Sequence, residues 1–313
     1  MVGPFRWLTM AILALLLAAC SGGAPRDVEI VIPQGASIAR AGTILEEAGA
    51  VSASDFRNHA RFFGGDAPIK PGEYKIEKGM GAGDILKLLQ SGKTVQRFVM
   101  IPEGMPSIMV WDRLMAQERL TGEIPVPAEG SILPDTYAYT TGESRAAVVK
   151  RMQAAMDRTF DELWSKRTPR AAVRDRNETM TLASIVEKET SVPAERRTVA
   201  GVYTNRLGVG MKLQADPTII YPITKGKPLG RRILRSEIQA VNDYNTYSMA
   251  GLPKGPIANP GKASIAAVLD PEPTDYLFFV ARGDGSHIFA RTLAEHNANV
   301  QKWYALRRER GEM

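Results

Sequence analysis

An apolar run near the N-terminus ends at the only cysteine of the chain, and these two features together restrict how the rest can fold. Residues 7–19 carry no charge, as in the apolar part of a secretory signal, and they are fewer than the roughly 20 that a full membrane span needs. The remainder is therefore expected outside the cytoplasm. With Cys20 alone it cannot form an internal disulfide bond, so its stability must come from a hydrophobic core. A hydrophobic content of 44% over 313 residues is sufficient for two domains.

Two modes of membrane attachment fit residues 1–26, which we interpret as a signal or anchor segment. The sequence LAACS over residues 17–21 resembles a bacterial lipobox, in which Cys20 would become the acylated first residue of a lipoprotein. Alternatively, the apolar run stays as a single N-terminal anchor in the bacterial inner membrane. Arg6 on its N-terminal flank favours a cytoplasmic N-terminus. Both modes place the bulk of the chain in the periplasm.

The charge distribution argues against nucleic acid as a partner. Forty Lys and Arg residues against 34 Asp and Glu give a formal net charge of +6, but the surplus is scattered along the chain. No basic stripe interleaved with aromatic residues is present, as a nucleic-acid-binding surface would require. A mildly basic surface is better suited to anionic lipid or wall polymer.

Residues 27–95 are expected to form a small α/β unit. Alternating apolar residues predict a strand over 28–32, and Ser37 occupies the N-cap position of a following helix. A second helical stretch, a strand entered from a turn at Pro71, and a short helix ended by Gly92 complete the unit. It resembles a LysM-like module, a domain that binds polymers of N-acetylglucosamine. The alternative is a packing module that only holds the next domain away from the membrane.

Residues 96–313 are expected to form a larger catalytic domain, which makes the protein α+β with a mixed sheet. A strand, a turn and an amphipathic helix follow one another over residues 98–114. A long helix is predicted from about residue 144 to 165, because apolar residues recur there at steps of four. Such spacing is typical of a core-facing stripe rather than of a cofactor site.

The segment over residues 180–190 contains the most informative carboxylate, Glu189. It has good helix formers and no Gly or Pro, and helical geometry places Glu189 in the middle of an apolar face with Leu182, Ile185 and Val186. Glu187 points roughly the opposite way. Burial raises the pKa of a carboxyl group and keeps a proton available for general acid catalysis. The alternative is a structural ion pair, for which the candidates are Arg196, Arg197 and Arg206.

Residues 183–190, ASIVEKET, resemble the active-site helix of the YceG-like endolytic murein transglycosylases. Further motifs follow in that family's order: NRL at 205–207, MKLQADPT at 211–218, YNTY at 244–247, GLPKGPI at 251–257, NPG at 259–261, YLFFV at 276–280 and GSHIF at 285–289. Upstream, EG at 129–130 and PDTY at 134–137 also match. The chain departs from the family at Cys20 and at Ser131-Ile132, where the family more often has a bulky apolar pair.

The resemblance implies a lyase rather than a hydrolase, with Glu189 as the single catalytic acid and base. Glu189 would protonate the bond between N-acetylmuramic acid and N-acetylglucosamine, and would then take the proton of the muramoyl C6 hydroxyl to close a 1,6-anhydro ring. Cleavage within nascent peptidoglycan strands would limit their length. No metal or cofactor is required, and the inner-membrane wall synthases are the implied partners. The alternatives are a true hydrolase and a peptidoglycan-binding scaffold lipoprotein without activity.

A sugar groove around the acid needs aromatic rings and side-chain amides. The candidate substrate-binding residues are Tyr244, Asn245, Thr246, Tyr247, Gln214 and Asp216. For the last two, a simple turn fixed by Asp216 before Pro217 is the alternative.

Two other classes of site are disfavoured by residue spacing. His287 and His296, with Glu295 nearby, could suggest zinc, but the chain has three His in total and no tight HxxxH or CxxC spacing. We therefore interpret His287 as a residue that hydrogen-bonds a core strand, and His296 as a residue of the final helix. A serine hydrolase is also disfavoured, because no GxSxG turn occurs.

Overall fold

The structure is a computed structural model that describes residues 23–311. Most of the expected anchor segment, with Cys20, lies outside these residues. No helix between residues 23 and 311 is long and apolar enough to span a bilayer. The chain divides into two compact units. Of the described residues, the smaller comprises 23–98, 119–121 and 138–143, and the larger comprises all the others.

The smaller unit is a two-stranded antiparallel sheet with three helices. Strand β1 (Val28–Ile32) pairs with β2 (Gly72–Ile76), and the helices are α2 (Ile38–Glu47), α3 (Ala53–Phe63) and α4 (Ala82–Ser91). The alternation predicted from the sequence is present, because Ile30 and Ile32 are buried against the helices. The predicted cap is also confirmed: the Ser37 hydroxyl accepts the Arg40 amide at the start of α2.

A buried ion pair stabilises the smaller unit. The Glu73 carboxylate is 1% exposed and accepts two hydrogen bonds from the Arg97 guanidinium, at 2.6 and 2.9 Å. The Thr141 hydroxyl donates to the same carboxylate at 2.5 Å. The Arg97 hydrogen bond lowers the pKa of Glu73 to about 2, against an ordinary value of 4.5.

Arg97→Ala is expected to destabilise the smaller unit by about 3 kcal/mol, because it leaves a buried carboxylate without its partner. The pKa of Glu73 is depressed on folding, so this contribution is present above pH 4.5 and disappears as the pH falls towards 2. Hydrogen exchange at the β2 amides measures the loss. The matched control is Lys75→Ala, whose pair with Asp27 is exposed on both sides and is expected to contribute much less to stability. Equal effects of the two variants would contradict the prediction.

The larger unit is mainly helical. It shares with the smaller unit the strand β3 (Arg97–Met100), which pairs with β4 (Thr136–Tyr139). Its helices are α5 (Ser107–Met115), α6 (Arg145–Trp164), α7 (Arg176–Glu189), the short 3-10 helix η1 (Pro193–Glu195), α8 (Arg196–Gly208), α9 (Pro217–Thr224), α10 (Arg235–Gln239) and α11 (Lys262–Leu269). The antiparallel hairpin of β5 (Phe278–Ala281) and β6 (His287–Ala290) precedes α12 (Leu293–Glu309).

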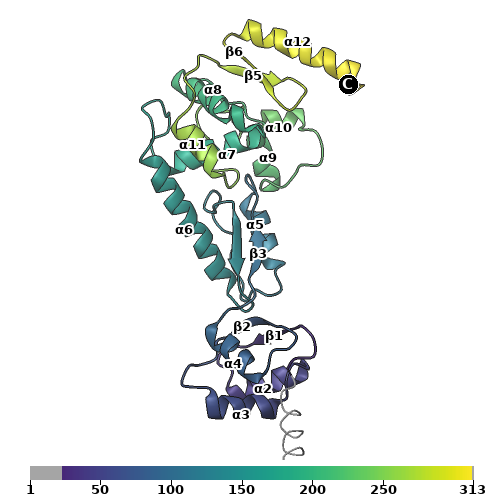
Figure 1. Ribbon diagram of the computed structural model, residues 1–313. Coiled ribbons are helices and arrows are strands. Elements are labelled where there is room, and N and C mark those ends of the chain that lie inside the picture. Colours follow the sequence, from purple (N-terminus) through teal and green to yellow (C-terminus); the bar gives the residue numbers. More distant parts are fainter. Residues whose placement is uncertain (1–22, 312–313) are drawn as a thin grey trace, which may run out of the picture. The chain divides into compact units, whose positions relative to one another are not determined.

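The core of the larger unit lies around α7, which packs against α8 and α11 (Figure 1). Residues 179–186 of α7 are all buried, so the helix needs covering on every side rather than on one face. The expectation of a larger mixed sheet is wrong: the described strands form three separate two-stranded sheets. Ala183 and Ser184 are buried on α7, and the Ser184 hydroxyl accepts the Ile257 amide at 3.0 Å from a segment that covers the helix. The coarser α+β assignment is confirmed.

Candidate active site

Glu189 is the last residue of α7, at the point where the helix must stop. Thr190 has extended backbone angles, and Pro193 follows three residues later. The C-terminus of a helix carries a partial negative charge, which disfavours an ionised carboxylate there. Helix geometry alone therefore already favours the protonated form of Glu189.

A groove of about 610 Å³ opens beside Glu189. One part of its wall comes from the end of α7 and from Arg206 on α8. A second part comes from Gln214 and Asp216 in the loop before α9 and from Tyr247 in the loop after α10. The opposite wall is built by the β5–β6 hairpin and α12: Phe279, Val280, Ala281, His287, His296, Val300, Trp303, Tyr304 and Arg307. Glu189 as a whole is half-buried: it borders the groove and is otherwise enclosed by protein.

The surroundings of Glu189 raise its pKa to about 7, from an ordinary value of 4.5. Burial is the largest cause, and the negative charge of Asp216 adds to it. A hydrogen bond from the Tyr203 hydroxyl and the positive charge of Arg206 act in the opposite direction. Tyr203 is 1% exposed, so this donor is held rigidly. Glu189 therefore exchanges its proton close to neutral pH, as a general acid and base must.

The three arginines considered as ion-pair partners are engaged elsewhere. Arg196 pairs with Glu103 at 3.1 Å and Glu187 at 3.5 Å, and Arg197 pairs with Asp270 at 2.9 Å. Arg206 donates to the backbone carbonyls of Leu277 and Leu213. Within residues 23–311, no ion pair joins Glu189 to any of the three. The geometry therefore favours the catalytic interpretation of Glu189 over the structural one.

Three of the predicted substrate-binding residues lie together on the groove. The Tyr247 hydroxyl donates to the Asp216 carboxylate at 2.6 Å, and Gln214 lines the same wall. Gln214 has a φ of 51°, a left-handed conformation that is uncommon for residues other than glycine and that often marks a functional site. The side chains of Gln214 and Asp216 are exposed and accessible to a ligand.

Asn245 and Thr246 are fully buried and do not line this groove. The Asn245 amide donates to the carbonyls of Glu237, Ile238 and Ala240, while its oxygen accepts the Tyr247 amide at 2.9 Å. The Thr246 hydroxyl accepts the Ala215 amide at 3.0 Å. This position favours a role in holding Tyr247 and the 214–216 loop rather than direct contact with sugar.

Tyr244 points to a different place from Tyr247. Its ring contacts that of Tyr221, with 4.9 Å between centroids, and the Tyr221 hydroxyl donates to Glu129 at 3.3 Å. Burial raises the pKa of Glu129, while hydrogen bonds from Ser107 and Tyr221 oppose this shift. The side chains of the YNTY motif therefore lie in three different places: Tyr247 on the groove, Asn245 and Thr246 in the interior, and Tyr244 against Tyr221.

The wall formed by β5, β6 and α12 contains groove residues that the sequence analysis did not assign to the site, including Trp303 and His287. Tyr203 was also missed, since a buried Tyr on a helix has no distinguishing local pattern. In the described part of the chain, no group of three or more His, Cys, Asp and Glu side chains is placed to hold a metal ion.

A carboxyl group whose pKa lies near 7, beside an open groove, is the arrangement that general acid–base catalysis requires. The chain belongs to the YceG-like family, whose profile matches residues 30–302.

Several relatives and one solved structure resemble the chain over most of its length. It is 28% identical over 315 residues to an endolytic murein transglycosylase of Bacillus subtilis (strain 168), covering 90% of this chain and 86% of the relative. It is 29% identical to one of Streptococcus pneumoniae serotype 2 (strain D39), covering 87% of this chain and 58% of that protein. A crystal structure of a putative YceG-like protein from Listeria monocytogenes is similar, with a TM-score of 0.55 and 29% identity, covering 87% of this chain and 98% of that one.

Proposed function

We propose that the protein is an endolytic murein transglycosylase, the activity for which its Bacillus and Streptococcus relatives are named. It cleaves bonds between N-acetylmuramic acid and N-acetylglucosamine within nascent glycan strands and so limits their length. The observation that carries the proposal is the Glu189 carboxyl group, with a pKa of about 7, at a groove. Burial also raises the pKa of Glu129, which lines a separate pocket together with Met180 and Pro256.

Glu189 acts twice in this mechanism. Protonated, it donates to the glycosidic oxygen, and the bond to the anomeric carbon of the muramoyl residue breaks. As a carboxylate, it then accepts the proton of the C6 hydroxyl, whose oxygen closes the 1,6-anhydro ring. One carboxyl group is sufficient because no water is added, whereas ordinary glycoside hydrolysis uses two. The pKa near 7 suits both steps, since the protonated acid and the carboxylate are both populated at neutral pH.

The groove residues supply binding. Gln214, Asp216 and Tyr247 are proposed as glycan ligands because they line the wall beside Glu189. Asn245 and Thr246 are proposed to hold that wall, and Tyr244 to pack beside it against Tyr221.

Hydrolysis is a second candidate, favoured by one observation. Asp216 lies close enough to Glu189 for its charge to raise the pKa of Glu189. A second carboxylate beside the acid is what a hydrolase uses to activate water. The hydrogen bond from Tyr247 occupies one oxygen of Asp216 and leaves the other for such a role.

The wider setting follows from the sequence. We propose attachment to the bacterial inner membrane through residues 1–26, either as an anchor or through an acylated Cys20, with the bulk in the periplasm. The smaller unit is proposed as a LysM-like glycan-binding module. Wall synthases that make nascent strands are the proposed partners.

Mass spectrometry of the products tests the proposal. The detergent-solubilised protein is incubated with uncrosslinked nascent peptidoglycan, and the new strand ends are analysed. The proposed reaction gives anhydro ends that are lighter by one water than the reducing ends of a hydrolase, and long internal fragments rather than terminal disaccharides. Reducing ends would assign the hydrolytic reaction instead. Absence of any new ends, with retained glycan binding, would indicate the scaffold alternative.

A further inference from the structure

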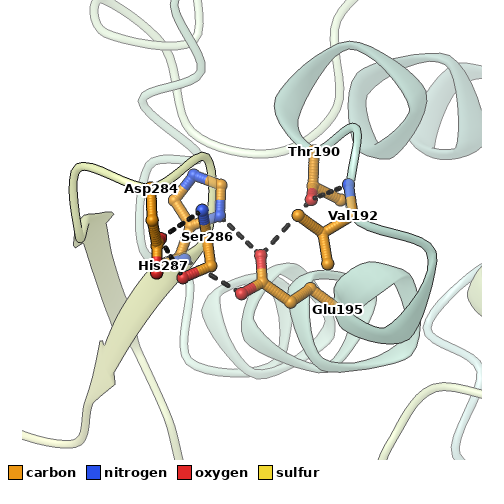
Figure 2. A network of polar contacts seen from close by, with 6 residues as sticks. All are labelled: Thr190, Val192, Glu195, Asp284, Ser286 and His287. Carbon is orange, nitrogen blue, oxygen red and sulfur yellow. Dashed lines mark hydrogen bonds and ion pairs between the residues drawn. The ribbon is translucent and has the colours of Figure 1, made fainter.

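A second carboxylate, Glu195, holds the ring of His287 on the groove wall (Figure 2). Glu195 ends η1, and His287 begins β6. The Glu195 Oε2 atom lies 2.8 Å from His287 Nδ1, and Oε1 accepts the His287 backbone amide at 2.9 Å. Both side chains are only 14% exposed. This two-point contact fixes both the backbone and the ring of His287.

The same carboxylate is connected to the end of the catalytic helix. The Thr190 hydroxyl, from the residue next to Glu189, donates to Glu195 Oε2 at 3.3 Å and accepts the Val192 amide at 3.0 Å. Thr190 is 3% exposed. Glu195 thus joins the C-terminus of α7 to the first residue of β6, as Figure 2 shows. The position of His287 is thereby set relative to that of the acid.

The hydrogen bonds determine which ring nitrogen is free for a ligand. A carboxylate has no proton to donate, so the proton shared between Glu195 and His287 belongs to Nδ1. In the neutral imidazole, Nε2 is then an acceptor. The ring of Phe279 packs against His287 edge-on, with 5.2 Å between centroids, and restricts its rotation. The turn before β6 is fixed as well, because Asp284 accepts both the amide and the hydroxyl of Ser286.

We propose that His287, oriented by Glu195, is a glycan-contacting residue whose Nε2 accepts a hydrogen bond from a hydroxyl or acetamido N–H of the sugar chain bound beside Glu189. This inference rests on the proposed function, since it names a contact for the same substrate. His287 contacts substrate, and Glu195 is a positioning residue that acts through it. The wall formed by β5, β6 and α12 is in this way part of the substrate site rather than only a cover for the core.

Two replacements of His287 separate contact with glycan from support of the hairpin. In His287→Asn the amide group occupies the position of Nδ1 and retains the bond to Glu195, but nothing reaches the groove. In His287→Gln the amide reaches the position of Nε2. In a Glu189→Gln background, which binds without cleaving, His287→Asn is expected to weaken the affinity for purified peptide-free glycan strands about fivefold, the effect of one lost neutral hydrogen bond. His287→Gln is expected to recover part of this loss.

The kinetics and spectra distinguish positioning from a merely structural role. In the active protein, His287→Asn is expected to raise KM with a smaller change in kcat, because the contact exists before and during the reaction. With three His in the chain, ¹⁵N spectra resolve each ring. His287 is expected as the Nδ1–H tautomer, and its Nε2 resonance is expected to shift when glycan strands are added. Glu195→Ala is expected to remove this tautomer preference, while His59, in the smaller unit, serves as an internal reference.

The outcomes separate this inference from the proposed function. Unchanged glycan affinity in His287→Asn, or an Nε2 resonance that glycan does not move, would overturn the role of His287 while cleavage by the wild type leaves the proposed function standing. If the His287→Asn variant unfolds, the wild-type spectrum alone tests the role of His287, through the shift or lack of shift of its Nε2 resonance when glycan strands are added. If the wild type neither cleaves nor binds glycan, both ideas are rejected together.

Discussion

Glu189→Gln is expected to lower the rate of glycan cleavage by about a thousandfold or more, because one group supplies both the acid and the base. Glutamine has nearly the same shape and can still accept the hydrogen bond from Tyr203, so the groove is retained. The assay is the formation of anhydro ends over time. The matched control is Glu187→Gln on the same helix, whose carboxylate accepts the Gly261 amide at 2.9 Å and pairs with Arg196. That variant is expected to retain cleavage and to lose stability instead.

The same substitution is expected to stabilise the fold at alkaline pH, which excludes unfolding as the cause of inactivity. The pKa of Glu189 is raised on folding from 4.5 to about 7. The favourable contribution of its protonated form is therefore complete below pH 4.5 and is lost as the pH rises through 7. The full shift corresponds to about 3 kcal/mol. Urea unfolding at pH 8 should show Glu189→Gln more stable than the wild type by up to this amount. A less stable variant at pH 8 would contradict the assignment of burial as the main cause.

The position of Glu189 could be predicted from the sequence because helical periodicity is local information. Seven residues separate it from Leu182, and two helical turns bring both to one face. The complete burial of α7 could not be read in the same way. Ser184 looks like a surface residue, yet its hydroxyl donates to the Thr181 carbonyl and accepts the Ile257 amide. This side of the helix is covered by the segment around Ile257, which is distant in the sequence and becomes visible as a neighbour only in the structure.

The remaining site residues depend on contacts that no local pattern records. Glu195 and His287 are 92 positions apart, so neither signals the other. Tyr244 and Tyr247 are three positions apart in the YNTY motif and were expected to act together, but the backbone between them directs one to Tyr221 and the other to Asp216. The residue types of such a motif predict a sugar-binding site. Which of its side chains line the groove depends on the backbone conformation, which the motif alone does not specify.

The pH dependence of cleavage is expected to follow the protonation of Glu189. The value of kcat/KM should be constant well below pH 7 and should fall tenfold per unit above it, to about one hundredth at pH 9, because only the protonated form can donate to the glycosidic oxygen. The midpoint of this descending limb of the profile gives the pKa of Glu189 in the free enzyme. It is measured from initial rates of anhydro-end formation across the pH range.

Two substitutions should move that limb in opposite directions. Asp216→Asn removes a negative charge that raises the pKa of Glu189, so its limb should lie at lower pH. Tyr203→Phe removes a hydrogen bond to the carboxylate that lowers the same pKa, so its limb should lie at higher pH. Weaker glycan binding in either variant would scale the whole pH profile and leave its midpoint in place. A limb that stays fixed in both variants would show that a group other than Glu189 donates the proton, and the single-acid mechanism would have to be abandoned.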